Sequence, residues 1–219
     1  MSMDLFPNFK ILVCFYQRIL NTADYKLIAA SFNISSNFNY INETSYNLES
    51  KIDGIKSSSN NEKNCLLCFK DKNNFLHCLK YQINENIFYI VNLPNKNCDM
   101  FETYFFNETN QYILIHKNES MNSFEIIKFN NNNENFEINS IQKIDLLECQ
   151  KTVGFSLVYS KIILKYILIT DCEKEDKWEI INKVPYFNST YSNDDNPTNN
   201  NNNNLTPKSS LEESDLSTY

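Results

Sequence analysis

Glycine is nearly absent from this chain, which has only two glycines, Gly54 and Gly154, among 219 residues. Average usage would give roughly 15. Glycine-rich phosphate loops, dinucleotide-binding fingerprints and a glycine-flanked catalytic serine are therefore excluded. Turns that need a positive φ must use another residue, and asparagine tolerates that conformation best. The 37 asparagines, many of them between apolar runs, are predicted to fill those turns.

Histidine and positive charge are also scarce. A Ser–His–Asp relay would have to use His77 or His116, and neither has a Ser or Cys at a catalytic motif spacing. No catalytic residue and no cofactor is therefore assigned. Acidic residues outnumber basic ones by 27 to 20, for a formal net charge of −7. This balance argues against a nucleic-acid or anionic-membrane partner.

Long apolar runs are lacking as well. None approaches the roughly 20 residues that span a membrane, so no transmembrane segment is predicted. The apolar run at residues 11–16 is shorter than the core of a signal peptide, which has about 7 residues or more. Seven cysteines nevertheless favour a secreted or extracellular location over a cytoplasmic one. Their odd number leaves at least one free or paired with another chain.

Asparagine also creates candidate N-glycosylation sites. Six sequons begin at Asn33, Asn42, Asn107, Asn118, Asn188 and Asn204. With this abundance of Asn, Ser and Thr, roughly five sequons arise by chance. Their number is therefore no evidence for glycosylation.

Aromatic residues, by contrast, are abundant, with 16 Phe and 13 Tyr. Such side chains fill a core and pack well on a pleated surface, so they favour strands. The tail at residues 189–219 is polar and rich in Asn, Ser and acidic residues. We expect this tail to be disordered.

One sequence pattern occurs twice, 54 positions apart. Residues 112–127 read YILIHKNESMNSFEII and residues 166–181 read YILITDCEKEDKWEII, with eight of 16 positions identical. Each copy has an apolar run, a polar loop and an aromatic-Glu-Ile-Ile segment, which predicts a β-hairpin. Residues 66–81 form a third copy, by residue type more than by identity. The run at 112–115 is apolar at every position, so both faces of that strand should be covered.

Further strands are predicted at residues 87–91, 103–106, 141–146 and 155–159, which extends each hairpin to three or four strands over about 50 residues. Such a unit resembles one blade of a β-propeller of kelch-like length, although no kelch or WD motif is present. The predicted fold is therefore all-β, with tandem four-stranded propeller-like units in an incomplete propeller. A β-sandwich is the alternative. The asparagine runs are typical of AT-rich protist genomes.

The repeats divide the chain into three predicted regions. Residues 61–188 form a β-repeat domain of about three units, and residues 189–219 form the acidic tail. Residues 1–60 leave two readings open. Helical spacing of apolar residues between Phe9 and Ala23 favours a helix, whereas the runs at 11–16 and 25–30 favour strands of a degenerate first unit. Residues 50–64 are predicted to be a loop.

The candidate metal ligands are Cys65, Cys68, His77 and Cys78, because a CxxC pair is a common half-site for zinc. A strand over residues 65–70 would put Cys65 and Cys68 on opposite faces, which argues against a shared metal. A disulfide between Cys68 and Cys78 is favoured if the loop covers residues 72–74, whereas a two-residue loop would place Cys68 opposite Leu79. Two buried thiols are the alternative.

A repeat architecture without a catalytic constellation predicts a non-enzymatic module for protein interaction or adhesion, with a protein or glycan partner. One alternative is part of a propeller-type enzyme, with acids or histidines converging on a central channel. Another is a degenerate or truncated product without independent function. Too few units are visible to close a ring, and an open edge invites pairing with another chain.

Overall fold

The computed structural model describes residues 1–21, 24–60, 62–94, 96–117, 123–131, 136–145, 151–174 and 177–183. In these residues the chain forms fifteen strands and two short 3₁₀ helices, Pro7–Phe9 and Ile34–Ser36. None of the helices in this part of the chain is long and apolar enough to cross a membrane. The all-β prediction is confirmed.

The strands form four antiparallel sheets, in each of which chain neighbours are also sheet neighbours. Sheet 1 contains β1 (Ser2–Phe6), β2 (Ile11–Asn21), β3 (Asp24–Asn33) and β4 (Asn39–Leu48). Sheet 2 contains β5 (Ile52–Ser59), β6 (Asn64–Asp71), β7 (Leu76–Gln82) and β8 (Ile87–Val91). Sheet 3 contains β9 (Met100–Phe106), β10 (Gln111–Lys117), β11 (Ser123–Asn131) and β12 (Phe136–Asp145). Sheet 4 contains β13 (Lys151–Ser160), β14 (Lys165–Lys174) and β15 (Lys177–Lys183).

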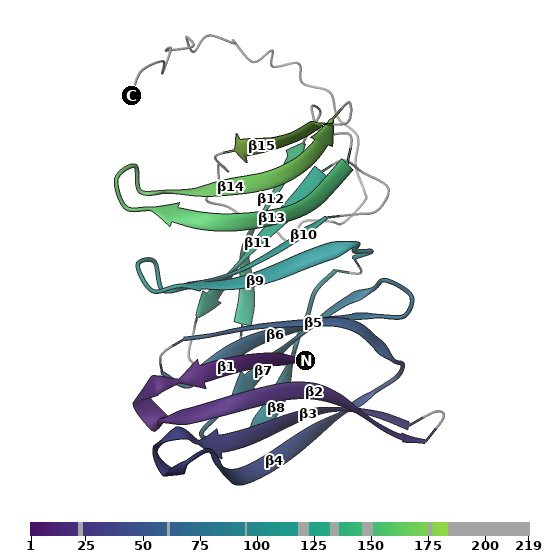
Figure 1. Ribbon diagram of the computed structural model, residues 1–219, viewed down its shortest axis with the longest axis vertical. Helices are drawn as coiled ribbons and strands as arrows, with labels where there is room; N and C mark the ends of the chain where they lie inside the picture. The colour runs from purple at the N-terminus through teal and green to yellow at the C-terminus, as the bar shows by residue number, and fades with distance from the viewer. Residues whose placement is uncertain are drawn as a thin grey trace, which may run out of the picture.

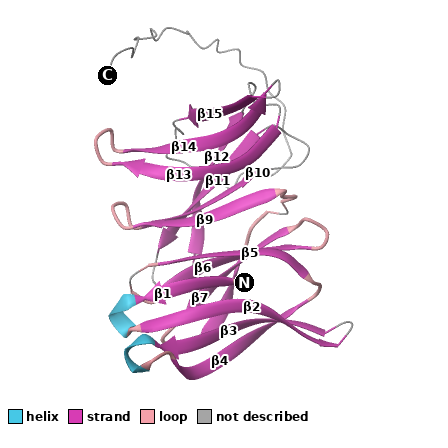
Figure 2. Ribbon diagram, viewed as in Figure 1, coloured by secondary structure: helices cyan, strands magenta, loops and turns pink. Residues whose placement is uncertain are grey.

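The sheets follow one another along the long axis of the molecule, with sheet 1 at one end and sheet 4 at the other (Figure 1). The first strands of successive sheets contact one another, β1 with β5, β5 with β9 and β9 with β13. These first strands form the inner edge of the array. Nearly all of the remaining described chain also lies in strands (Figure 2). Four-stranded meanders around a common inner edge are the blades of a propeller. Here the array is an open arc, a partial propeller.

The N-terminal segment is made of strands, and the helical reading of residues 1–60 is wrong. Strands β1–β4 form a complete first sheet, in which β2 and β3 pair over most of their length. Apolar side chains on both faces of β2 produced the misleading helical spacing. Alternation places Val13 and Phe15 in the cluster toward sheet 2, and Cys14 on the other face.

The loop predicted at residues 50–64 is also wrong in part, because residues 52–59 form β5. This strand lacks an apolar pattern because polar contacts with β1 hold it. The Ser57 hydroxyl hydrogen-bonds that of Ser2 at 2.6 Å, and the Ser59 N–H donates to Oδ1 of Asp4 at 3.0 Å. The tail predicted at residues 189–219 lies outside the described residues.

The repeat places one tyrosine at the start of the second strand in both sheet 3 and sheet 4. The Tyr112 hydroxyl donates to the carbonyl of Asn64 at 2.7 Å and accepts from the N–H of Asn60 at 3.0 Å. Both partners lie at the β5–β6 turn of sheet 2. The Tyr166 hydroxyl contacts Oγ1 of Thr109 at 2.6 Å, at the β9–β10 turn of sheet 3. Each repeat tyrosine therefore ties its own sheet to the preceding one.

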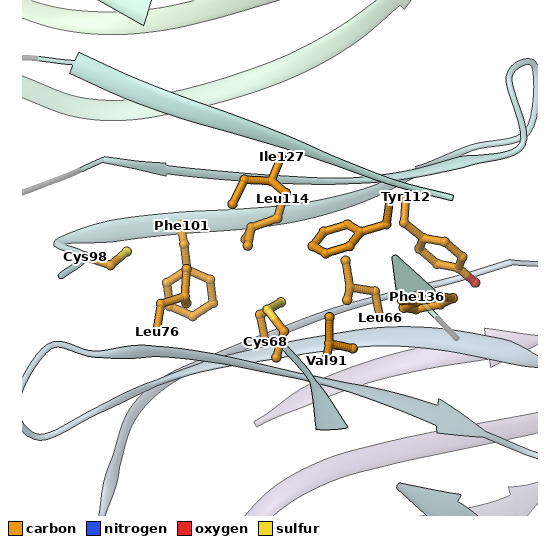
Figure 3. Packing of buried hydrophobic residues seen from close by; sticks show 12 residues of the cluster. Leu66, Cys68, Leu76, Val91, Cys98, Phe101, Tyr112, Leu114, Ile127 and Phe136 are labelled. Carbon is orange, nitrogen blue, oxygen red and sulfur yellow. A yellow bond between two sulfur atoms is a disulfide. The ribbon is translucent and has the colours of Figure 1, made fainter. Parts of the chain in front are cut away.

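Apolar clusters fill the spaces between successive sheets. Tyr112 and Leu114 belong to the cluster between sheets 2 and 3, whereas Ile113 and Ile115 belong to the cluster between sheets 3 and 4. Figure 3 shows the first of these clusters, where Leu66 and Val91 of sheet 2 face sheet 3. All four residues of the run at 112–115 are buried. The prediction that both faces of this strand are covered is confirmed.

Asparagine replaces glycine at tight turns, as the sequence predicts. Asn37, Asn74, Asn86 and Asn110 have φ between 51° and 65°. The asparagine side chain tolerates this left-handed conformation better than most. Neither glycine has a positive φ, so neither is required by a left-handed turn.

Candidate functional site

The inner edge of sheets 2, 3 and 4 contains a cleft of about 380 Å³. We call it the axial cleft and define it by Asp53, Gly54, Lys56, Lys70, residues 99–102 and residues 153–155. The beginnings of β5, β9 and β13 supply most of its wall, and the end of β6 supplies Lys70. Three sheets thus contribute equivalent segments to one site.

Both glycines of the chain line the axial cleft, each at an irregularity in the first strand of its sheet. The register of β5 against β6 shifts between Ile52 and Gly54, and that of β13 against β14 shifts just before Gly154. A β-bulge bends the strand and redirects the side chain of the extra residue. The extra residues, Asp53 and Val153, both line the cleft. Glycine therefore accompanies the bulges that shape this site.

Charged side chains of both signs line the cleft, and four of them form ion pairs. Lys56 forms an ion pair with Glu102. The ammonium of Lys70 lies 3.5 Å from Oδ2 of Asp53 and donates to the carbonyl of Asp99 at 3.1 Å. The carboxylates of Asp53 and Glu102 therefore each have a lysine at ion-pair distance. Such a site offers complementary charges and hydrogen bonds at its rim.

A cluster of ionisable side chains lies beside the cleft, in the space between sheets 2 and 3. His116 pairs in register with Phe101 of the cleft, and its Nε2 lies 3.3 Å from Oε2 of Glu125. Nζ of Lys96 lies 2.7 Å from the same oxygen. The His116 imidazole, followed by Lys96, outweighs burial and lowers the pKa of the Glu125 carboxyl to about 2. Hydrogen bonds from His116 and Lys96 thus stabilise the carboxylate of Glu125, and none of the three residues lines the cleft.

The four candidate zinc ligands do not share one site. Cys65 is buried between sheets 1 and 2, whereas Cys68 and Cys78 are buried between sheets 2 and 3. This is the opposite-face placement that a strand over residues 65–70 predicts. His77 stacks on Phe69 with 5.2 Å between ring centroids. Among the residues that the structure describes, no three His, Cys, Asp or Glu side chains are placed to hold a metal ion.

Cys68 and Cys78 instead form a disulfide, with their Cα atoms 4.1 Å apart. They are direct partners in the pairing of β6 with β7. The N–H of Asp71 bonds the carbonyl of Phe75 at 3.0 Å, which closes a loop over residues 72–74. This is the loop length that the sequence linked to the bridge. Buried Cys172 is also disulfide-bonded.

Free thiols account for the other cysteines of the described chain. Cys65 and Cys98 are buried, and Cys14 is half-buried on sheet 1. Burial is the main cause that raises the pKa of the Cys98 thiol to about 12. The buried thiols therefore stay protonated at neutral pH and act as small core side chains.

The candidate glycosylation sites differ in their surroundings. Asn42 and Asn107 are exposed, on β4 and on the β9–β10 turn. Asn33 is half-buried, and its side chain accepts a hydrogen bond from the N–H of Ser35 at 2.9 Å. Asn118, Asn188 and Asn204 lie outside the described residues.

A second pocket of about 460 Å³ reaches from β4 of sheet 1 to β8 of sheet 2. Tyr46, Phe69 and His77 supply aromatic side chains, with Glu49 and Asp71 beside them. Nε2 of His77 lies 3.3 Å from Oδ2 of Asp71. Aromatic faces next to carboxylates can stack on a ligand ring and hydrogen-bond its edge.

Sequence reasoning did not identify the residues of the axial cleft. Their positions are separated by whole sheets along the chain, so no motif spacing connects them. The two glycines were the available signal, because both mark the start of a first strand. Asp53 and Asp99 occupy equivalent positions in their sheets. Asp53 precedes Gly54, which pairs with Lys70 at the end of β6. Asp99 precedes Met100, which pairs with Lys117 at the end of β10.

No protein-family model matches the chain, and no curated protein matches its sequence. Among solved structures the chain is similar to an exo-β-1,3-galactanase from Phanerochaete chrysosporium, crystallised with β-1,3-galactotriose. The identity is 8% and the TM-score is 0.36, over 74% of this chain and 44% of that one. The chain spans less than half the length of that enzyme. The partial-propeller assignment rests on the four sheets themselves.

Proposed function

We propose that the protein is a non-enzymatic interaction module that binds a protein partner through the axial cleft. The observation that carries this proposal is the convergence of three sheets on one open site that is lined by apolar side chains and by ion pairs. Phe101, Val153 and Phe155 supply the apolar part, and 44% of Val153 is exposed. Apolar anchors within a polar rim are typical of protein–protein interfaces.

The pairing of the carboxylates supports binding over acid–base catalysis. A general acid or base must lie within hydrogen-bond reach of the substrate proton that it transfers. The carboxylates of Asp53 and Glu102 are instead engaged in ion pairs with Lys70 and Lys56. The propeller-type enzyme remains the second candidate, and the axial cleft is where its acids would lie.

A photo-crosslinking amino acid at Val153 tests the binding proposal. We expect it to form a covalent adduct with a protein from the native source. The matched control is the same amino acid at Ile87 of β8, which is 45% exposed against 44% for Val153 and lies outside the cleft. Equal labelling from both positions, or none from Val153, contradicts the proposal.

The two alternative functions have separate tests. If the purified chain cleaves oligosaccharides and Glu102→Gln abolishes the release of reducing sugar, the protein is an enzyme. If the chain unfolds without a cooperative transition in urea, it is a degenerate product. An interaction module should release no sugar and unfold cooperatively.

A further inference from the structure

The two ends of the arc carry sheet faces on which no other described sheet packs. Each inner sheet has two covered faces: a backward face, which packs on the preceding sheet, and a forward face, which packs on the following sheet. Sheet 1 has only its forward face covered, by sheet 2. Sheet 4 has only its backward face covered, by sheet 3.

Every internal interface in the described chain has the same polarity. Equivalent residues of the second strands face the same way in each sheet: Leu67, Leu114 and Leu168 all lie in the cluster toward the preceding sheet. The uncovered backward face of sheet 1 therefore corresponds to the faces that, in sheets 2, 3 and 4, pack on the forward face of another sheet. The uncovered forward face of sheet 4 is of the complementary kind.

The backward face of sheet 1 is apolar over most of its width. Strand register places the following residues on it: Met3, Leu5, Leu12, Cys14, Tyr16, Ile28, Ala30, Phe32 and Tyr40. Met3 is 56% and Tyr40 57% exposed. Charges also lie on this face: Arg18 of β2 pairs with Glu43 of β4 at 2.8 Å across β3, where Ile28 and Ala30 are buried. A contiguous apolar face of this kind marks an interaction surface.

The forward face of sheet 4 is also apolar at its centre. Val158 of β13 pairs with Ile167 of β14, and Ile169 follows on the same face. Val158 is 46% exposed. Asp171 lies on this face toward the β14–β15 hairpin, and Arg18 lies on sheet 1 toward the β2–β3 hairpin. When two sheets pack with the internal polarity, these opposite charges lie at the same end.

We propose that the forward face of sheet 4 in one copy of this chain docks on the backward face of sheet 1 in a second copy. The sheet 4 of the same copy cannot reach, because it stands at the opposite end of the arc (Figure 1). A two-fold axis repeats the contact, so two copies close a ring of eight sheets and cover both end faces of each. In this ring the axial clefts line the central channel.

Single charge substitutions on the two faces test the interface. We expect the full chain to have twice the 25.8 kDa mass in light scattering after size exclusion. Met3→Asp on sheet 1 and Val158→Asp on sheet 4 should each raise the dissociation constant of the dimer about tenfold or more. Both side chains are exposed in the single chain, so each variant should keep its thermal unfolding transition. The control Ile90→Asp, at a residue that is 68% exposed on β8, should leave the dimer intact.

Mixing the two variants identifies the pairing. If the faces dock as proposed, one Met3→Asp copy and one Val158→Asp copy share one interface with both substitutions and one without any. We expect the mixture to recover association, by way of the unsubstituted interface. Cleft binding, measured by crosslinking at Val153, is a separate readout, so the two proposals fail independently.

Three outcomes would overturn the ring. A wild-type chain that stays monomeric at its highest soluble concentration shows that another polypeptide covers the faces, or that none does. A dimer sensitive to Met3→Asp alone shows that two copies of sheet 1 pack against each other. Filaments that grow with concentration show that the contact repeats without closing.

Discussion

The interface between sheets 2 and 3 and the interface between sheets 3 and 4 use the same sequence repeat but are reinforced differently. Tyr112 bonds backbone groups of Asn60 and Asn64, whereas Tyr166 bonds the side chains of Thr109 and Gln111. The first interface contains the Cys68–Cys78 bridge, and the second contains disulfide-bonded Cys172. The repeat therefore sets where two sheets are joined, whereas the residues around the repeat set how strongly the sheets are held together.

The two interfaces also differ in their buried charge. Glu125 faces sheet 2 beside His116 and Lys96, which together lower its pKa. Lys128 lies on the other side of sheet 3, with its ammonium 4.8 Å from the centroid of the Tyr166 ring. Burial lowers the pKa of Lys128 to about 8. The interface of sheets 2 and 3 therefore favours the ionised form of Glu125, whereas burial at the interface of sheets 3 and 4 disfavours the ionised form of Lys128.

Removal of the disulfide should have the largest effect. The double variant Cys68→Ala with Cys78→Ala should lower the free energy of unfolding by about 3 kcal/mol, because the bridge restricts the unfolded chain. Urea unfolding measures the change, with Cys14→Ala, a free half-buried cysteine, as the control. A double variant as stable as that control would contradict the prediction.

The oxidation state of the Cys68–Cys78 bridge in the native protein tests whether the protein is secreted. Mass spectrometry of protein from its native source, with and without reduction, should show the disulfide and any occupied sequon. We expect the oxidised form, in keeping with the proposed secreted location. Fully reduced, unglycosylated protein would refute that location.

Acid should weaken the interface of sheets 2 and 3 through Glu125. Its folded pKa of about 2 lies below its ordinary value of 4.5, so its stabilisation is complete above pH 4.5 and is lost as the pH falls toward 2. Between pH 6 and pH 3 the wild type should lose roughly 1–2 kcal/mol more than Glu125→Gln. Urea unfolding at both pH values measures this. The exposed carboxyl of Glu137 supplies the control Glu137→Gln, and an equal acid response in all three proteins would count against the mechanism.

The two repeat tyrosines should differ when each loses its hydroxyl. Tyr112→Phe should cost about 1.5 kcal/mol, because a second acceptor position on the buried carbonyl of Asn64 becomes empty. The 3.0 Å hydrogen bond between the N–H of Asn60 and the Asn64 carbonyl remains and limits the loss. Tyr166→Phe should cost about 0.5 kcal/mol, because the half-buried side chains of Thr109 and Gln111 can turn to water. Chemical denaturation of both variants checks the order, and the reverse order would break the comparison.

The smallest expected effect is a gain in stability when Lys128 is replaced. Its folded pKa lies below the ordinary 10.5, so stability should rise as the pH increases from about 8 toward 10.5. Lys128→Met should stabilise the chain by about 0.5 kcal/mol at pH 7 and by less at pH 10. Thermal unfolding at the two pH values measures the gain. Lys143→Met, at a half-exposed lysine of β12, should change neither value.

Much of sheets 2, 3 and 4 was predictable because their second and third strands are apolar runs separated by polar turns. The strand predicted at residues 87–91 coincides with β8, and those at 103–106 and 155–159 lie within β9 and β13. Strand β5 was missed because its serines are held by polar contacts with another sheet, which leave no periodicity in the sequence. The N-terminal strands were ambiguous because apolar residues on both faces of β2 also fit a helix.

The hairpins and the asparagine turns depend on neighbours along the chain, so they could be read from the sequence. The sequence left two loop lengths open at residues 72–74, and the folded chain sets Cys68 opposite Cys78. The axial cleft, the tyrosine contacts and the two uncovered faces arise only in the folded chain. Each depends on how separate sheets stack, and packing between sheets brings together residues such as Lys56 and Glu102 that no local pattern connects. The scarcity of glycine has its meaning there too, because both glycines stand where that stacking opens a site.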